Sequence, residues 1–179
     1  MGGPAYIEDV STRLVSATTT IDAPAEAVFA ILADPRQHPR IDGSGTLQGT
    51  ISGPDRLTRG ATFGMDMKLF GVPYKIRNRV VEYDEGRLIA WRHFGGHRWR
   101  YELEPVDGPG GQGGAGTRVT ETFDYSPYNW FWAKGIELAG FPERNRRGIE
   151  GTLVRLKAAA EADAGAGSGS TAEGTGDEG

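Results

Sequence analysis

The stretch from Leu47 to Tyr125 constrains the fold of this chain more than any other part, because it holds a succession of strand-like segments and no helical pattern. Short runs rich in β-branched and aromatic residues alternate there with turns of Gly, Pro and Asp. The expected strands span residues 47–52, 59–69, 73–83, 87–94, 97–106 and 117–125. Strands joined by such short turns pair antiparallel, so the stretch predicts a meander of six strands.

The part of the chain that precedes this meander adds a seventh strand and two short helices. Residues 12–21 alternate as a half-buried strand does, and a helical repeat follows them and ends at Asp34-Pro35. The closely spaced Pro35 and Pro39 leave room for only one further short helical turn.

The C-terminal segment provides a cover for the sheet. Residues 128–161 have a helical pattern, which Gly140-Phe141-Pro142 interrupts because proline breaks or kinks a helix. Beyond the break an apolar stripe recurs at helical spacing, formed by Ile149, Thr152, Leu153, Leu156 and Ala160. We therefore predict an α+β fold in which a curved seven-stranded antiparallel sheet meets one long C-terminal helix.

Composition limits the domain organisation and the available chemistry. The 179 residues suit one core, which we assign to residues 12–162, after an N-terminal segment of residues 1–11. Residues 163–179 are rich in Gly and Ser and hold four acids and no base, which predicts a disordered acidic tail. The absence of cysteine excludes disulfides, thiol nucleophiles and cysteine-ligated metals.

Charge and hydropathy bear on partners and location. The formal net charge is −4, and without the tail the acids and bases balance, so the basic excess that nucleic-acid binding needs is missing. We interpret the basic residues of neighbouring strands as cross-strand partners of acids such as Glu102 and Glu104; they are Lys75, Arg77, Arg79, Arg92, Arg98 and Arg100. No apolar run is long enough to span a bilayer, and the N-terminus lacks a secretory pattern. We expect a cytoplasmic protein with no nucleic-acid partner and no stable membrane insertion.

The order of elements, together with several short motifs, resembles the START-related helix-grip superfamily (SRPBCC, birch-pollen-allergen-like), and within it the polyketide cyclase/dehydrase and lipid-transport group. The motifs are Ile21-Asp22-Ala23-Pro24, Val28-Phe29, Leu32-Ala33-Asp34, Arg87-Leu88-Ile89-Ala90-Trp91, Trp99-Arg100-Tyr101-Glu102-Leu103 and Gly116-Thr117-Arg118-Val119-Thr120-Glu121. Ile41 departs from the pattern, because relatives often carry Trp there. The resemblance covers about residues 12–160 and implies a helix-grip fold with a ligand cavity between the sheet and the long helix.

We predict the residues that line such a cavity from the alternation along the strands and from helical spacing in the segment that follows them. The candidates are Phe63, Met65, Met67, Trp91, His93, Trp99, Tyr101, Glu121, Phe123, Tyr125, Phe131, Lys134 and Leu138. Aromatic rings and methionines would give a hydrophobic ligand flat and adaptable contacts. The alternative is an ordinary filled core, with Lys134 extending to solvent.

Glu121 and His93 are the candidates for acid and base chemistry. Glu121 has the strand parity of Phe123, so its carboxyl is expected to point inward, where a lone charge is costly. His93 could exchange protons with it, because the imidazole pKa lies near neutrality. The alternatives are a carboxylate at a wet rim paired with a base, and a hydrogen-bonded core histidine. We expect no metal at His93 and His97, because no third ligand is evident.

These observations support three interpretations of function. The first is a monomer or weak homodimer that binds a small hydrophobic molecule, such as a lipid, polyketide or aromatic metabolite, without a cofactor, through segments 68–74 and 140–142 as gates. The second is a polyketide cyclase, aromatase or dehydratase that uses Glu121 and His93. The third is a module that binds another protein and has no small ligand. The sequence leaves open whether the chain is an enzyme.

Overall fold

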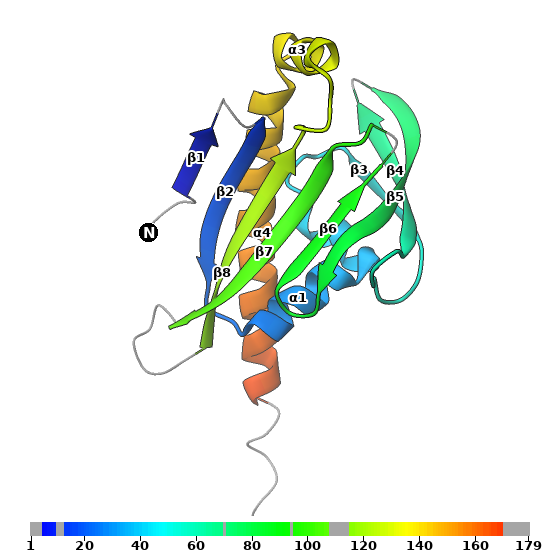
Figure 1. The fold of residues 1–179 in the computed structure, drawn as a ribbon. Coiled ribbons are helices and arrows are strands. Elements are labelled where there is room, and N and C mark those ends of the chain that lie inside the picture. Colours follow the sequence, from blue (N-terminus) through cyan, green and yellow to red (C-terminus); the bar gives the residue numbers. More distant parts are fainter. Residues whose placement is uncertain (1–4, 10–12, 70, 94, 108–114, 170–179) are drawn as a thin grey trace, which may run out of the picture.

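The computed structural model describes residues 5–9, 13–69, 71–93, 95–107 and 115–169. Within these ranges the chain forms an eight-stranded antiparallel sheet in the order β1-β2-β8-β7-β6-β5-β4-β3 (Figure 1). The strands are β1 (Ala5–Asp9), β2 (Leu14–Ile21), β3 (Leu47–Ser52), β4 (Thr62–Leu69), β5 (Val72–Asp84), β6 (Leu88–Arg92), β7 (Arg98–Asp107) and β8 (Ala115–Asp124). Consecutive strands from β3 to β8 are neighbours, which confirms the predicted meander.

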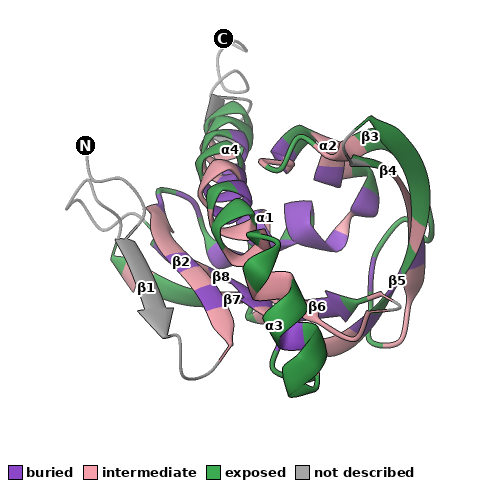
Figure 2. Cartoon of the chain, turned by 90° about the horizontal axis from the view of Figure 1, so that it is seen from above, coloured by how far each residue is buried: buried purple, intermediate pink, exposed green. Residues whose placement is uncertain are grey.

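The helices lie on the concave side of this sheet. They are α1 (Ala25–Ala33), the 3-10 turn η1 (Pro35–Gln37), α2 (His38–Ile41), α3 (Trp130–Leu138) and α4 (Phe141–Gly169). Figure 2 shows the sheet curving from β2 round to β3, with α1, α2 and α4 inside the curve. The predicted α+β fold, with two short helices after the first predicted strand and a long C-terminal helix, is confirmed. The break at residues 140–142 separates α3 from α4, and Gly140 adopts a φ of +71° there.

The sheet has one strand more than predicted. β1 falls within residues 1–11, which the sequence analysis placed outside the domain, and it pairs antiparallel with β2 from Ala5↔Thr18 to Asp9↔Leu14. Without β1, the backbone of β2 would be an unpaired edge of the sheet. Pairing with β1 satisfies that edge, which explains why this short segment is a strand.

The long helix also continues further than predicted. α4 runs past Asp163 to Gly169, into the segment that composition assigned to a disordered tail. The carboxylate of Asp163 accepts two hydrogen bonds of 2.8 Å from the guanidinium of Arg40, and Ala164 packs against the core. These contacts give the last turns of α4 tertiary support; residues 170–179 lie outside the described residues. None of the helices in the described ranges combines the length and apolarity needed to cross a bilayer.

The core lies between α4, α1 and the sheet. The predicted apolar stripe of α4 is buried, with Ile149, Leu153 and Leu156 fully inaccessible. The turn after α2 makes a close contact with this helix, where the backbone nitrogen of Gly43 donates to Oγ1 of Thr152 at 3.1 Å. A Cβ atom at Gly43 would lie 2.0 Å from the backbone nitrogen of Thr152, so this contact requires glycine.

Candidate functional site

A cavity of about 740 Å³ lies between the concave face of the sheet, the α2–β3 segment and the region where α3 meets α4. A volume of this order suits a small organic ligand. Eight of the predicted residues line it: Met65, Met67, Trp91, His93, Trp99, Tyr101, Glu121 and Phe123. All eight come from strands β4, β6, β7 and β8 or from the turn after β6, because strand alternation turns these side chains toward the concave face.

Two predicted residues pack behind the cavity wall. The ring of Phe63 is buried, with its centroid 5.4 Å from that of His38 and 5.6 Å from that of Trp91. Tyr125 is also buried and stacks on Phe123 at 5.5 Å. Both therefore support lining residues from behind and are not among the residues that line the cavity.

Three residues predicted from helical spacing lie outside the cavity. Phe131 and Leu138 on α3 are 66% and 87% exposed, and the ammonium of Lys134 lies 3.4 Å from the carboxylate of Glu137. The prediction placed these three residues on a helix before the break, with side chains that approach the cavity. Instead, α3 turns Ala133 toward the core, and Phe131, Lys134 and Leu138 lie on its exposed sides.

Glu121 occupies the centre of β8, opposite Ala17 of β2 and Tyr101 of β7. Its side chain is only 2% exposed, and its Oε1 accepts a 2.8 Å hydrogen bond from the hydroxyl of Tyr101. The Oε2 atom has no hydrogen-bond partner among the described residues. Burial raises the pKa of Glu121 well above its usual value, and the nearby Asp42 adds to this, while the Tyr101 bond acts in the opposite direction. Burial therefore favours the neutral, protonated form of Glu121 over the carboxylate.

His38 is a second polar group of the wall, and the sequence analysis missed it. Its Nε2 donates to the carbonyl of Leu32 at 3.0 Å, so in the neutral ring Nδ1 is an acceptor. Nδ1 is buried without a partner among the described residues, and burial lowers the pKa of the ring. The ring stacks on Trp91 with centroids 5.1 Å apart.

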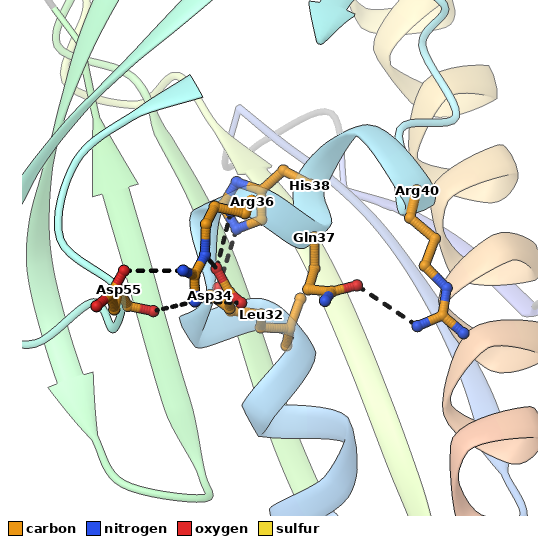
Figure 3. A network of polar contacts seen from close by, with 7 residues as sticks. All are labelled: Leu32, Asp34, Arg36, Gln37, His38, Arg40 and Asp55. Atoms are coloured by element: carbon orange, nitrogen blue, oxygen red, sulfur yellow. Dashed lines mark hydrogen bonds and ion pairs between the residues drawn. The ribbon is translucent and has the colours of Figure 1, made fainter. Parts of the chain in front are cut away.

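A network of charged residues fixes the segment that carries His38. Arg36 contacts the carboxylates of Asp34 and Asp55, each at 2.8 Å (Figure 3). Asp34 also accepts from the backbone nitrogen of Arg36, which closes the turn between α1 and α2. The crowding of prolines in this segment predicted a turn; no feature of it indicated that His38 would reach the cavity.

Asn78 is a third polar group of the wall, and the sequence analysis did not predict it. It lies on β5 opposite Phe63 of β4 and is buried, and its Nδ2 has no hydrogen-bond partner in the described part of the chain. The available signal was alternation, because Arg77 and Arg79 on the outer face place Asn78 on the inner one. Glu121, His38 and Asn78 together give the apolar cavity three buried polar side chains.

The turn between β6 and β7 brings two histidines together at the cavity wall. The rings of His93 and His97 meet edge to face with centroids 4.2 Å apart, and His97 Nδ1 lies 2.8 Å from the hydroxyl of Tyr128. Burial and the neighbouring His93 lower the pKa of His97 to about 3, and burial lowers the pKa of His93. The described residues contain no cluster of three or more His, Asp or Glu side chains suited to a metal ion.

The outer face of the sheet carries the basic residues singled out from the sequence. Glu82 lies between two of them, 3.1 Å from Arg98 and 3.1 Å from Arg100. Arg100 also contacts Glu102, and Arg118 pairs with Glu104 at 3.0 Å. Among the six basic residues, Arg98 and Arg100 contact Glu82 of β5, and Lys75 lies 3.5 Å from Asp66 of β4, as cross-strand pairing predicts, whereas Arg100 and Glu102 belong to the same strand.

Comparison with curated proteins gives two relatives in Mycobacterium tuberculosis. The uncharacterized protein Rv0088 of strain H37Rv is 43% identical over 152 residues, and the uncharacterized protein MT0096 of strain CDC 1551 is 42% identical over 152 residues. The match covers 84% of this chain and 65% of each relative, so the chain spans less than two thirds of their length.

Solved structures show the same fold at low sequence identity. A protein from Arthrobacter aurescens has a TM-score of 0.64 at 17% identity, covering 88% of this chain and 91% of that one. Protein Ms6760 from Mycobacterium smegmatis has a TM-score of 0.59 at 20% identity, with coverage of 86% and 97%. An AHSA1-like protein from Aeromonas hydrophila has a TM-score of 0.57 at 18% identity, with coverage of 92% and 99%.

The comparison with family models concerns almost the whole folded region. The model described as polyketide cyclase / dehydrase and lipid transport matches residues 12–161, from the segment before β2 into the last turns of α4. This match and the shared helix-grip fold confirm the resemblance drawn from the sequence. The chain belongs to the polyketide cyclase/dehydrase and lipid-transport family.

Proposed function

We propose that this chain binds a small hydrophobic molecule, a lipid, polyketide or aromatic metabolite, in the cavity between the sheet and α4. Rings and thioethers from strands β4 to β8 form an apolar part of the wall, and they give an apolar ligand contact without requiring a charge. Binding then draws its free energy from buried apolar surface, at about 25 cal/mol per Å² before the cost of ordering the ligand.

The observation that carries this proposal is the buried carboxyl of Glu121 in the wall of an apolar cavity. Its Oε1 accepts a hydrogen bond from the Tyr101 hydroxyl, and Oε2 has no partner in the described chain. A buried polar atom without a partner costs about 1–3 kcal/mol, so a ligand hydroxyl or carbonyl that reaches it recovers part of that cost. In this proposal Glu121 orients the ligand, together with Asn78 and His38.

Occupation of the cavity is tested with the fluorescent probe N-phenyl-1-naphthylamine and a variant that fills the space. Met67→Trp adds an indole to the lining, and we expect it to weaken probe binding at least ten-fold. Val154→Trp is the matched control, because Val154 lies on α4 with 58% exposure and is not among the lining residues. Equal probe affinity in the wild type and Met67→Trp would contradict the proposed cavity site.

The orienting role of Glu121 is tested with two probes of similar shape, naphthalene and 2-naphthol. One hydrogen bond to a buried group contributes about 1 kcal/mol. The wild type should therefore bind 2-naphthol roughly five-fold more tightly, relative to naphthalene, than the hydrophobicity of the two probes alone predicts. Glu121→Gln should keep the preference and Glu121→Leu should erase it. A preference that survives in Glu121→Leu would assign the polar anchor to another residue.

A second candidate function is a cyclase, aromatase or dehydratase activity. It is favoured by the presence of a carboxyl, Glu121, and an imidazole, His93, in the wall of one cavity, where burial raises the pKa of the first and lowers the pKa of the second. With a polyketone substrate, Glu121→Gln or His93→Phe would then lower turnover by roughly 10²-fold or more, while a binding protein would keep its affinity in both variants.

A further inference from the structure

The large apolar side chains that are exposed gather at one end of the molecule. Among the described residues, six of the seven such side chains come from the β4–β5 hairpin or from α3, and the seventh is Val154. We call these six the apolar rim: Val72, Tyr74, Trp130, Phe131, Trp132 and Leu138. An exposed apolar cluster of this kind marks an interaction site.

The apolar rim includes two residues at the opening of the cavity. Tyr74 and Trp132 are exposed and also line the cavity, so the cavity reaches the surface between the hairpin and α3. Figure 1 shows α3 and the tip of the β4–β5 hairpin at the same end of the sheet, the upper end in that view. A ligand that leaves an apolar environment would therefore enter the cavity past these side chains.

The local structure of α3 keeps its rings exposed. The side chain of Asn129 caps the helix by accepting from the backbone nitrogen of Trp132 at 3.1 Å. Residues 130–132 then follow at about 100° intervals around the axis, so one face cannot bury all three rings. The buried residue of α3 is the small Ala133, and Trp130 and Phe131 remain 70% and 66% exposed.

The charge near the opening differs in sign from that of the rest of the chain. Residues 66–77 and 130–147 together contain seven Lys or Arg and three acids, while the remaining sequence contains 13 Lys or Arg and 21 acids. Trp and Tyr favour the boundary between water and lipid, and a basic surface attracts anionic head groups. In a symmetric dimer formed through this end, two surfaces of the same positive sign would face each other.

From this combination we propose that the apolar rim docks on the surface of an anionic phospholipid bilayer, with the cavity opening turned toward the lipid. The bilayer contact goes beyond ligand binding and does not depend on which molecule the cavity holds. Docking is peripheral, with the aromatic rings at the head-group level and the flanking Lys and Arg near the lipid phosphates.

The test measures how much of the full chain sediments with two kinds of vesicle. Mixed vesicles contain equal amounts of phosphatidylglycerol and phosphatidylcholine, and the second kind contains phosphatidylcholine alone. We expect binding to the mixed vesicles, at least ten-fold weaker binding to phosphatidylcholine, and loss of binding in 0.5 M NaCl. The double variant Trp130→Ser/Phe131→Ser should lower binding to mixed vesicles at least ten-fold. Val154→Ser, the matched exposed control, should bind like the wild type.

Three results would overturn the docking proposal: wild-type protein that stays in the supernatant with mixed vesicles, a double variant that binds like the wild type, or a rim-dependent dimer in size-exclusion chromatography in place of vesicle binding. Circular dichroism establishes that the variants are folded. Neither Trp130 nor Phe131 is among the residues lining the cavity, so the double variant should bind N-phenyl-1-naphthylamine normally in the absence of vesicles. Failure of lipid docking is therefore distinguishable from failure of ligand binding.

Discussion

The raised pKa of the Glu121 carboxyl follows from the position of this residue between two other strands. The small Ala17 lies opposite it on β2, and Tyr101 lies opposite it on β7 and donates to one carboxyl oxygen. A hydroxyl donor stabilises the carboxylate less than a guanidinium would, so desolvation dominates and raises the pKa of Glu121. The same carboxyl on the solvated face of β8 would be an ordinary charged group.

This residue predicts a measurable dependence of stability on pH. Because burial raises the pKa of Glu121 in the folded state, the folded chain holds more protons than the unfolded chain above pH about 4.5. Its contribution to the free energy of unfolding therefore falls as pH rises toward the folded pKa, by at most about 1.4 kcal/mol per pH unit. Between pH 5 and pH 8, Glu121→Gln should gain stability relative to the wild type.

The measurement is the difference in melting temperature between the two proteins at each pH, because groups common to both then cancel. Glu104→Gln, a change at an exposed position of β7, should follow the wild type across the range. A constant difference between Glu121→Gln and the wild type would contradict a raised pKa.

At the scale of residues, the sequence predicted the strand positions of the wall better than the rest. Alternation placed Trp99, Tyr101, Glu121 and Phe123 on one face, since a residue two positions along a strand returns to the same side. Helical spacing did not predict which side chains of α3 face the cavity. Three consecutive large rings point in different directions around a helix, so they do not mark one buried face. His38 could not be found in this way, since its position depends on how α1 and α2 pack.

At the scale of elements, the contact between the α2–β3 turn and α4 limits how the helix can sit against the domain. A Cβ atom added at Gly43 would lie 2.0 Å from a backbone nitrogen of α4, and backbone cannot move aside as a side chain end can. One added at Gly151 would in turn lie 3.1 Å from the Cα atom of Gly43. Two glycines thus allow a close approach that fixes the depth of α4 beside the cavity.

We expect Gly43→Ala to lower the free energy of unfolding by about 1–3 kcal/mol, because the methyl group forces the turn and α4 apart. Gly135→Ala is the matched control, since a Cβ atom there meets no atom within 4 Å and alanine favours helix. The control should gain about 0.5–1 kcal/mol. Urea unfolding measures both, and equal effects of the two substitutions would contradict the role of close approach.

Among the elements, the meander and the break before α4 followed from local signals. Gly, Pro and Asp mark the turns. Proline is tolerated only in the first turn of a helix, so Pro142 indicates that a new helix begins there. β1 and the end of α4 were missed because both depend on distant partners. β1 exists through its pairing with β2, and the last turns of α4 are supported by Arg40, which is far away in the sequence.

At the scale of the whole molecule, the end of α4 and the segment beyond it make different contributions to stability. Removal of residues 170–179 should leave the melting temperature unchanged, since that segment contains no large apolar side chain to bury. Removal of residues 163–179 also deletes the partner of Arg40. An exposed ion pair contributes about 0–1 kcal/mol, so we expect a fall of at most about 2–4 °C.

Calorimetry of the two truncated proteins tests this difference, and Asp163→Asn separates the ion pair from the helical turns. A large fall on removing residues 170–179 would show that this segment packs against the domain. A fall in the longer truncation that Asp163→Asn does not reproduce would assign the effect to the helix end instead.

The two C-terminal helices differ in how deeply they are buried, and this difference has a consequence for ligand exchange. α4 carries the buried stripe through Ile149, Leu153 and Leu156, so tilting it outward would expose the core. Ala133 is the buried residue of α3, so we expect displacement of α3 to cost less free energy than displacement of α4. If the cavity binds a ligand as proposed, local opening of α3 would let that ligand exchange at a rate that varies independently of the global stability of the protein.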